Sequence, residues 1–243
     1  MTQALVLAAG LGSRIRSVAG DLPKPLMPFG GEPILVGNLR WLADSGVTDV
    51  WINLHFGAEA IRRTIGDASG LGLAVRYVFE PELLGTAGAL GNIRQEVTGP
   101  IFVVYGDSVV RCSLDALAAR HHAQAAEITI ALFDRDRHAH TGIAGGRVKL
   151  GQDGSVDGFV EGAGDSNGQP LVNAGVYLVN PSVFDLIPPG FSDFGRDIFP
   201  AMLGAARRLD GHIMEDDGFC LGLDTPESHA TGLALLEQGR LVL

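Results

Sequence analysis

Short apolar runs alternate with helix-type patterns along the first half of the chain. Apolar runs that end in glycine or charged residues are typical of buried strands, and apolar positions three or four apart are typical of helices. The predicted strands cover residues 3–8, 47–54, 73–79, 101–105 and 127–133. The predicted helices cover residues 33–45, 58–65, 86–93 and 113–122. This alternation implies right-handed βαβ crossovers and a mostly parallel sheet.

The second half of the chain has a different pattern. Shorter strands with glycine-bearing turns are predicted at residues 148–150, 156–160 and 171–179, and helices near residues 194–206 and 227–238. No linker-like segment separates the halves, and no repeat is visible. The sequence therefore predicts one α/β domain over residues 1–243, a three-layer α/β/α sandwich around a mixed, mostly parallel sheet.

Composition and charge restrict the class of protein. The 243 residues, 46% of them apolar, are enough to bury about 70% of the unfolded surface. With 18 basic and 28 acidic side chains the formal charge is −10 and no basic stripe is present, which argues against a nucleic-acid partner. An anionic substrate would have to be held locally, by backbone amides, a few placed cations and a metal.

Targeting signals and special residue types add little. The N-terminus lacks a basic n-region and no apolar run approaches the ~20 residues of a membrane span, so we expect a cytoplasmic protein without a membrane partner. Cys112 and Cys220 are expected to be buried thiols. The seven histidines show no ligand spacing and are expected at the surface.

A glycine-containing loop, A-G-L-G-S-R, follows the first predicted strand. Gly10 and Gly12 would let the backbone turn sharply and present amides to phosphate oxygens. The dinucleotide fingerprint would need glycine where Ile15 stands, and the P-loop would need Gly-Lys-Ser/Thr, so neither motif applies. The glycine pair by itself is equally compatible with a structural turn.

Cations follow this loop closely. Arg14 and Arg16 precede the segment D-L-P-K-P-L, in which Pro23 and Pro25 stiffen the backbone around Lys24. A triphosphate substrate needs placed cations, since charge builds up between its α- and β-phosphorus atoms during transfer. The alternative is a solvated loop lysine.

Asp107 stands just past the apolar strand at residues 101–105. Such a carboxylate can hold Mg²⁺, which prefers oxygen ligands and takes few of them from protein. The alternative is that Asp107 caps the following turn.

The motifs L-A-A-G-x-G-S-R-x-R, D-L-P-K-P-L and P-x-G-G-x-P together resemble the signature of the sugar-1-phosphate nucleotidyltransferase (sugar-nucleotide pyrophosphorylase) family. The resemblance runs along almost the whole chain and implies a Rossmann-like nucleotidyltransferase domain. Its substrates would be a nucleoside triphosphate and a sugar 1-phosphate, with Mg²⁺ as cofactor. It implies catalytic roles for Arg14, Lys24 and Asp107. The nucleotide-binding residues that it implies are Leu7, Ala8, Gly10, Gly12, Ser13, Glu80, Gly85 and Thr86.

The second metal carboxylate is open. Many family members carry D-x-G-T-P or D-x-D-T-P late in the chain, but here the first acid is replaced by Gly222. Asp224 is then either the second metal ligand or the cap of a helix that begins at Pro226.

The sugar side is implied by two further segments. The N-A-G-x-Y strand resembles that of the family, whose asparagine contacts sugar hydroxyls, and this assigns Asn173 to the sugar. Glu161 matches the acid of F-x-E-K, and Gly142 matches a glycine beside the sugar. The lysine that normally meets the sugar phosphate is replaced by Gly162. Its candidate replacements are Arg147 and Lys149, which can equally be solvated cations of a strand.

The base and the overall activity remain open between alternatives. The segment E-x-x-L-L-G-T-A-G-A-L at residues 80–90 resembles the nucleobase loop of mannose- and heptose-1-phosphate guanylyltransferases, and its small residues would let a flat base pack on the backbone. GTP and a heptose- or mannose-type acceptor are therefore favoured. W-I-N-L-H also occurs in muramic-acid-phosphate uridylyltransferases, so a uridylyltransferase for an amino-sugar 1-phosphate is the alternative.

Three other classes of protein are alternatives. A catalytically silent, sugar-nucleotide-binding regulatory relative is suggested by Gly162 and Gly222. A metal-dependent glycosyltransferase would carry D-x-D where this chain has Gly-Asp-Ser, and a nicotinamide enzyme is disfavoured by Ile15. A homodimer is compatible with the sequence.

Overall fold

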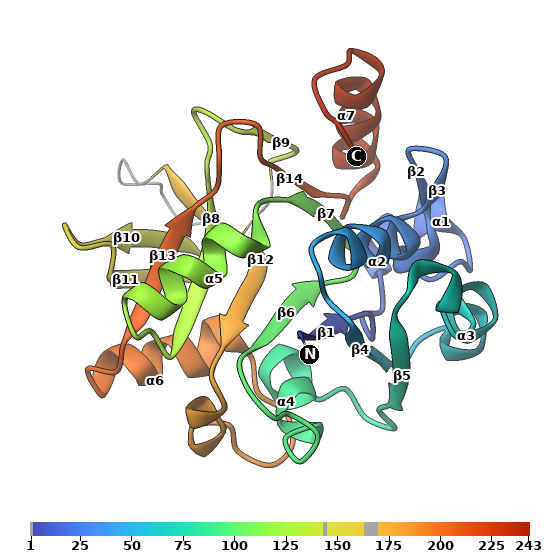
Figure 1. Ribbon diagram of the computed structural model, residues 1–243. Helices are drawn as coiled ribbons and strands as arrows, with labels where there is room; N and C mark the ends of the chain where they lie inside the picture. Colours follow the sequence, from blue (N-terminus) through green and yellow to red (C-terminus); the bar gives the residue numbers. More distant parts are fainter. Residues whose placement is uncertain (1, 143–144, 163–169) are drawn as a thin grey trace.

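A nine-stranded mixed sheet forms the centre of the molecule (Figure 1). The computed structural model describes residues 2–142, 145–162 and 170–243. The strand order is β11–β10–β12–β6–β1–β4–β5, and β8 lies between β12 and β13 beside this path. The strands of this sheet are β1 (Gln3–Leu7), β4 (Asp49–Leu54), β5 (Ala74–Phe79), β6 (Ile101–Tyr105), β8 (Ile128–Asp134), β10 (Arg147–Leu150), β11 (Val156–Val160), β12 (Leu171–Val179) and β13 (Leu209–Ile213).

The first half of the chain builds the parallel part of the sheet, as predicted. β1 pairs in parallel with β4 and β6, and β4 pairs in parallel with β5. The crossovers contain α2 (Ile34–Asp44), α3 (Ala58–Ile65) and α4 (Gly85–Asn92). The predicted helix at residues 58–65 and the strand at residues 101–105 have the observed bounds. Local patterns sufficed here because the elements are short, buried and bounded by glycines.

The second half of the chain adds antiparallel strands and one unexpected parallel strand. β12 runs antiparallel to β6 and β8, whereas β13 pairs in parallel with β8. β13 is not predicted by the local pattern, because L-D-G-H-I contains two polar side chains that only tertiary contacts compensate. The predicted helix near residues 194–206 is divided into a π-helical turn, η5 (Phe194–Ile198), and α6 (Phe199–Gly204).

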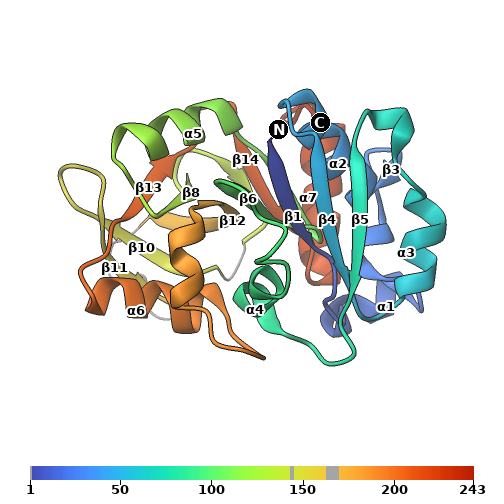
Figure 2. The ribbon, with the colours of Figure 1, turned by 60° about the horizontal axis from the view of Figure 1, so that its bottom comes forward.

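Helices cover both faces of the sheet (Figure 2). α2, α3 and α5 (Leu114–Ala123) pack on one face, and α4, η5 and α6 pack on the other. The side chains of β1 alternate accordingly: Ala4 and Val6 point into the first core and Leu5 into the second. The three-layer α/β/α sandwich with a mixed sheet is thereby confirmed.

A small second sheet lies at one end of the molecule. β7 (Ser108–Arg111) pairs antiparallel with β14 (Phe219–Gly222), which pairs in parallel with β9 (Ala139–His140). Together with the hairpin β2 (Pro28–Phe29) and β3 (Glu32–Pro33) and with α7 (Pro226–Glu237), it surrounds a third core. In this pairing Ser108 lies opposite Gly222. The pairing thus brings Asp107 close to the segment that carries Asp224.

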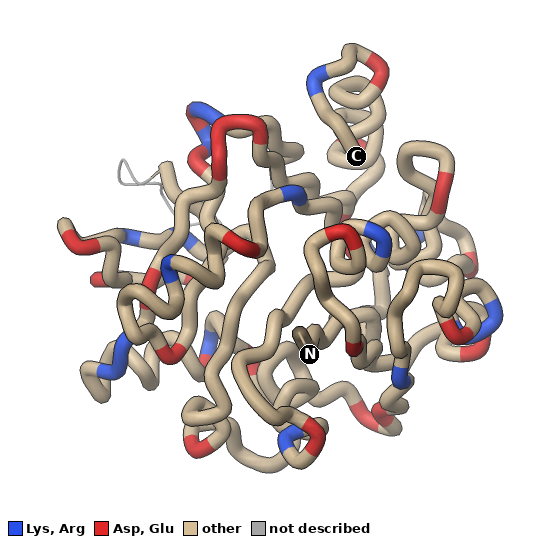
Figure 3. The backbone as a smooth tube through the Cα atoms, in the orientation of Figure 1, with Lys and Arg blue, Asp and Glu red and all other residues tan. Residues whose placement is uncertain are grey.

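The remaining expectations concern surface and burial. Among the described residues, no helix is long and apolar enough to cross a membrane. Lys and Arg are interspersed with Asp and Glu along the tube of Figure 3. Both cysteines are buried free thiols, as predicted, and burial raises the pKa of Cys112 to about 12. The surface placement of the histidines is wrong for His121 and His138, which are buried.

Candidate active site

The carboxyl ends of β1 and β6 form the crevice at which the site lies. Leu7 is the register partner of Tyr105, and the chain leaves the two strands in different directions. In open α/β sheets ligands bind at such a point. The amide of Gly106 donates to the Leu7 carbonyl (2.9 Å), and a Cβ atom at position 106 would lie 2.9 Å from the same oxygen. Gly106 therefore lets Asp107 approach the glycine loop.

The glycine loop approaches the lysine segment closely. Gly12 has a left-handed φ of +58°, and a Cβ atom there would lie 3.2 Å from the Cβ of Lys24. On the other side, a Cβ atom at Gly57 would collide with the ring of Pro23. The two glycines thus allow the segment around Lys24 to pack between the β1 loop and the start of α3.

Lys24 lies at the centre of a charge cluster, which we call the active-site cluster: Arg14, Lys24, Asp107 and Asp224. The Lys24 Nζ donates to Asp107 Oδ2 at 3.0 Å and to Asp224 Oδ1 at 2.7 Å. Arg14 Nη2 lies 3.2 Å from the same Asp224 oxygen. Lys24 is only 3% exposed whereas Arg14 is 67% exposed, so the interpretation of Lys24 as a solvated loop lysine is wrong.

Burial and charge act on Lys24 in opposite directions. Burial by itself would lower the pKa of Lys24, but the carboxylates of Asp107 and Asp224 more than reverse this effect and raise the pKa above its ordinary value. The ammonium is therefore held in its charged form. A buried cation that stays protonated is suited to stabilise negative charge that develops beside it.

The two carboxylates are a donor set that fits Mg²⁺. Both accept from the same ammonium and are about one third exposed, at 32% for Asp107 and 30% for Asp224. Mg²⁺ is commonly bound through one or two carboxylates together with substrate phosphates. Within the described part of the chain no group of three or more His, Cys, Asp or Glu side chains could hold a metal. A metal here would therefore depend on these two acids and on the phosphates.

Asp224 does not cap the helix that follows it. The N-cap of α7 is Thr225, whose side chain accepts from the Ser228 amide at 3.2 Å in a reciprocal capping box. The cap interpretation of Asp224 is therefore wrong. The side chain of Asp224 instead contacts Lys24 and Arg14.

A cavity of about 240 Å³ continues from Asp107 along the ends of the strands. Five of the residues predicted to bind nucleotide line it: Leu7, Gly10, Glu80, Gly85 and Thr86. Ala8, Gly12 and Ser13 are not in this lining, and the amide of Ala8 is already bonded to the side chain of Asn53 at 2.7 Å. The structure thus brings most, but not all, of the predicted nucleotide residues together.

Asn53 and Glu80 form a buried hydrogen-bonded pair between the ends of two strands. Asn53 Nδ2 donates to Glu80 Oε1 at 2.9 Å, and the Leu84 amide donates to Glu80 Oε2 at 3.1 Å. Glu80 is almost completely buried, so these contacts connect β4 to the loop that follows β5. Sequence reasoning missed Asn53, although a polar residue inside the apolar run W-I-N-L was a usable signal.

The small residues of the 85–88 segment contact protein backbone. A Cβ atom at Gly85 would lie 2.6 Å from the Ser192 carbonyl oxygen, and one at Gly88 would collide with the Gly190 carbonyl oxygen. This is a further reason for glycine at positions 85 and 88; the packing of a flat base on this backbone stays a prediction, and Gly85 lines the cavity. These glycines let the 190–192 segment dock, and this brings Phe191 into the cavity lining.

The predicted sugar residue Asn173 belongs to a polar chain beside the cavity. Its Oδ1 accepts from the Gly175 amide (2.8 Å), and its Nδ2 donates to the Tyr177 hydroxyl (2.7 Å). The Tyr177 hydroxyl lies 3.4 Å from that of Tyr105, which lines the cavity. Burial raises the pKa of Tyr105 to about 12, so both hydroxyls are neutral donors. Each end of the Asn173 amide keeps one further hydrogen-bonding position.

Glu161 lies against η5. A Cβ atom at Gly195 would collide with the Glu161 carboxylate, and burial raises the pKa of Glu161 while the nearby Arg196 lowers it. Arg147 pairs with Val160, one residue before Glu161. Because successive side chains of a strand alternate between faces, Arg147 lies on the opposite face of the sheet from Phe159, which packs in the core that contains η5.

Lys149 lies on the same face of the sheet as Arg147, two residues along β10, and is exposed. Arg196, which follows Gly195, is close enough to Glu161 to lower its pKa. Gly142 is exposed beyond β9, where the neighbouring Thr141 hydroxyl donates to the Gly222 carbonyl at 2.9 Å. The structure therefore places Gly142 near the end of β14, with residues 143–144 outside the described part.

A larger cavity, about 690 Å³, lies between α2, β7 and the C-terminal segment. Arg111 lines it, and burial lowers the pKa of Arg111 to about 10. None of the residues predicted from the sequence to act in catalysis or binding lines this cavity. The smaller cavity, which touches Asp107, is the candidate active site.

Open α/β sheets of this Rossmann-like kind bind nucleotides in the crevice at the switch point, and the active-site cluster lies at that point here. The profile of the nucleotidyl transferase family matches residues 3–218, and the chain belongs to this family. Mannose-1-phosphate guanylyltransferase catalytic subunit beta of Drosophila pseudoobscura pseudoobscura is 30% identical over 240 residues, which cover 96% of this chain and 62% of that protein. The mannose-1-phosphate guanyltransferase of Schizosaccharomyces pombe is also 30% identical, with 96% and 64% covered. The chain thus spans less than two thirds of the length of these relatives.

Solved structures share the fold. HddC from Yersinia pseudotuberculosis superposes with a TM-score of 0.78 at 23% identity, over 97% of this chain and 100% of HddC. A crystal structure of HddC complexed with GMP-PN gives a TM-score of 0.77 at 24% identity, with the same shares covered. These likenesses agree with the predicted Rossmann-like fold.

Proposed function

We propose that this chain transfers a nucleoside monophosphate from a nucleoside triphosphate to a sugar 1-phosphate and releases pyrophosphate. GTP is the favoured donor, and a mannose- or heptose-type 1-phosphate is the favoured acceptor. The guanylyltransferase relatives at 30% identity and the HddC complex with GMP-PN support this choice. The observation that carries the proposal is the buried Lys24 ammonium between Asp107 and Asp224, with Arg14 on the open side.

The chemistry needs positioning and charge neutralisation. An oxygen of the acceptor phosphate attacks the α-phosphorus in line, the bond from the α-phosphorus to the bridging oxygen breaks, and pyrophosphate leaves. No general base is required, because a phosphate dianion is already a nucleophile. Lys24 and Arg14 supply positive charge where negative charge develops in the transition state. Amides of the loop around Gly10 and Gly12 would hold the outer phosphates.

Asp107 and Asp224 would hold Mg²⁺. When bound, the ion neutralises phosphate charge and acts as a Lewis acid. The donor set supports this assignment because it consists of two partly exposed carboxylates, and oxygen ligands are those that Mg²⁺ prefers.

On the acceptor side, Asn173 and Glu161 would bind sugar hydroxyls, and Gly142 is a further candidate. We assign the acceptor phosphate to Arg196 because it lies beside Glu161, whereas Arg147 faces away. An exposed guanidinium is suited to a phosphate, which it can contact through two hydrogen bonds.

A pyrophosphate-release assay across four nucleoside triphosphates and a panel of sugar 1-phosphates tests the proposal. The expected result is release with GTP and a mannose- or heptose-type phosphate, and release that is about 10²–10³-fold slower in Lys24→Ala. Release with UTP and an amino-sugar phosphate would favour the uridylyltransferase alternative. If no pair of substrates releases pyrophosphate while the chain binds a sugar nucleotide tightly, the result would favour the regulatory relative that Gly162 and Gly222 suggest.

We further propose that the protein acts in the cytoplasm, where a supply of nucleoside triphosphates is available, and that it forms a homodimer. Cell fractionation tests the first statement, and light scattering of the purified chain tests the second. A membrane-fraction location or a monomeric mass would contradict them.

A further inference from the structure

Phe191 is an exposed aromatic residue in the lining of the candidate nucleotide cavity. It is 59% exposed, whereas Phe194 and Phe199, which follow closely in the chain, are fully buried. Single exposed apolar residues are common on protein surfaces, so exposure by itself indicates no function. The support and the position of Phe191 distinguish it from such residues.

The backbone next to Phe191 is fixed to the start of α4. Ser192 is fully buried, and its amide donates to the Leu84 carbonyl at 2.9 Å. Its carbonyl accepts from the amides of Ala87 and Gly88, both at 2.9 Å. These three backbone hydrogen bonds hold the segment in one position, and they present the neighbouring ring to the cavity rather than to the core.

A second contact fixes the other end of the same segment. Asp193 Oδ1 accepts from both the amide and the hydroxyl of Thr86, each at 3.1 Å, and the Thr86 hydroxyl in turn accepts from the Phe194 amide at 2.9 Å. Thr86 lines the cavity. The segment that carries Phe191 and the predicted base loop are therefore one structural unit.

The cavity suits a nucleoside better than a complete sugar nucleotide. Its volume of about 240 Å³ is below the range of roughly 300–1,000 Å³ that is typical of sites for drug-sized ligands. Among the described residues its lining contains five that are predicted to bind nucleotide and none of the three predicted to bind sugar. Apart from the phenol of Tyr105, Phe191 supplies its only aromatic ring within the described chain.

We propose that the nucleobase of the triphosphate stacks on the ring of Phe191. This inference rests on the proposed function and deepens it by assigning an affinity-determining residue for the donor. Every base has a π-face, so stacking would contribute to the binding of all four triphosphates. Purines offer the larger face, and we expect the contribution to be greater for GTP and ATP than for UTP and CTP.

Calorimetric titration of the full chain with each nucleoside triphosphate and Mg²⁺, without sugar phosphate, tests the inference. Phe191→Ala should weaken GTP binding about tenfold, and Phe191→Tyr, which keeps an aromatic ring, should bind within about twofold of the wild type. Phe191→Leu should fall between them, because it keeps apolar area but no π-face.

Phe79 provides a matched control. It is 52% exposed but lines a different depression, beside α3. Phe79→Ala should leave the GTP affinity unchanged, and thermal melting should show that both alanine variants remain folded. An unchanged GTP affinity in Phe191→Ala, or an equal loss in Phe79→Ala, would overturn the stacking assignment.

Two further outcomes separate this inference from the proposed function. If Phe191→Ala raises only the KM for the sugar phosphate, the ring belongs to the acceptor, and the stacking assignment is wrong while the proposed function stands. If the wild-type chain binds no nucleoside triphosphate at all, the proposed function and this inference fail together.

Discussion

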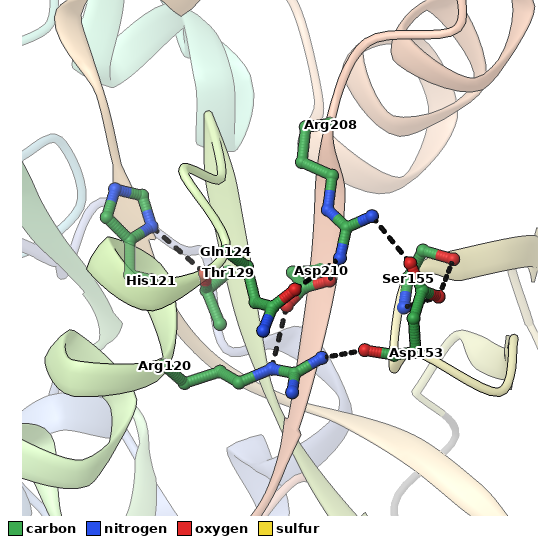
Figure 4. Close-up of polar contacts among 8 residues, drawn as sticks. All are labelled: Arg120, His121, Gln124, Thr129, Asp153, Ser155, Arg208 and Asp210. Atoms are coloured by element: carbon green, nitrogen blue, oxygen red, sulfur yellow. Dashed lines mark hydrogen bonds and ion pairs between the residues drawn. The ribbon is translucent and has the colours of Figure 1, made fainter.

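Two ion clusters in this molecule differ in the sign of the charge that is buried. In one, which we call the distal network (Arg120, Asp153, Arg208 and Asp210), the carboxylate of Asp210 is fully buried between two guanidinium groups (Figure 4). Arg120 Nε lies 2.7 Å and Arg208 Nη2 lies 2.8 Å from its oxygens. In the active-site cluster the buried member is the Lys24 ammonium, and its two carboxylates are about one third exposed.

The difference separates a cluster that holds the fold from one that is suited to chemistry. The buried anion of the distal network is paired with two guanidinium groups of the protein, and its pair with Arg120 joins α5 to β13. Arg120 also contacts the Asp153 carbonyl, and Arg208 contacts the Asp153 carboxylate at 2.8 Å. In the active-site cluster the anions are partly exposed to solvent, where a metal cation can join them. Five variants test this difference and its consequences.

The largest effect is expected from Lys24→Ala. Loss of a preorganised charge next to the reacting phosphate should lower turnover by about 10²–10³-fold. The melting temperature should change little, because water can solvate the carboxylates that are left. Steady-state kinetics with thermal melting measures both, and Lys149→Ala, which removes an exposed lysine, is the control. Normal turnover would contradict the role of Lys24.

The opposite result is expected from Arg120→Met in the distal network. Removing one partner of the fully buried Asp210 should destabilise the fold by about 3 kcal/mol. For a chain of this size that corresponds to a fall in melting temperature of roughly 6–12 °C. Turnover per folded molecule should be unchanged. The control is Arg137→Met, which removes the partner of the exposed Asp216. Its expected cost in folding stability is about 0–1 kcal/mol. Equal melting temperatures of the two variants would refute the comparison.

Asp224→Asn tests the role of an exposed carboxylate in the active-site cluster. If Asp224 binds Mg²⁺, the Mg²⁺ concentration that gives the half-maximal rate should rise about tenfold or more. Thr225→Ala removes the cap of α7 and should cost about 1 kcal/mol of stability with no change in Mg²⁺ demand. A magnesium titration of both variants decides the matter. An unchanged demand in Asp224→Asn would leave Asp107 as the sole protein ligand.

Arg196→Ala tests the acceptor side with an effect of similar or smaller size. Loss of a charge-assisted hydrogen bond should raise the KM for the sugar phosphate about tenfold and leave that for the nucleoside triphosphate unchanged. Lys149→Ala is again the control, because Lys149 is exposed on the same face of β10 as Arg147, the face opposite Val148. A higher KM for the nucleoside triphosphate instead would move Arg196 to the donor side.

The smallest effect concerns pH and a residue that flanks the distal network. Burial lowers the pKa of His121, whose Nδ1 lies 2.9 Å from the Thr129 hydroxyl. The unfolded chain protonates this histidine below about pH 6.5, whereas the folded chain resists protonation. The contribution of neutral His121 to folding stability is therefore complete above that pH. It is lost as the pH falls toward the lowered pKa of His121 in the folded chain.

Denaturant unfolding between pH 7.5 and 5.5 measures this loss. His121→Gln should flatten part of the pH dependence, and the neighbouring exposed His122→Gln should leave it as in the wild type. The pKa of His140 is also lowered by burial, so some dependence should persist. Identical profiles for all three proteins would contradict the prediction.

Local patterns were sufficient wherever one element carries its own signal. The strands at residues 156–160 and 171–179 and the cap at Ser113 follow from spacing and residue type alone. The same holds for the glycine loop and for the proline-flanked lysine. By contrast, β13 was missed because its Asp210 is compensated by Arg120, 90 residues away. A polar residue whose partner is so distant cannot be recognised as buried from its own neighbourhood.

The class of fold and the chemical groups of the site follow from the amino-acid sequence, since turns, buried strands and a stiffened lysine depend on neighbouring residues. Which of these groups meet depends on tertiary packing. Lys24 finds its carboxylates 83 and 200 residues further along the chain. Tertiary packing also decides that Phe191 reaches the nucleotide cavity, because Gly85 and Gly88 admit the 190–192 backbone. Such contacts depend on how separate strands pair and how segments dock, which a local sequence pattern does not predict.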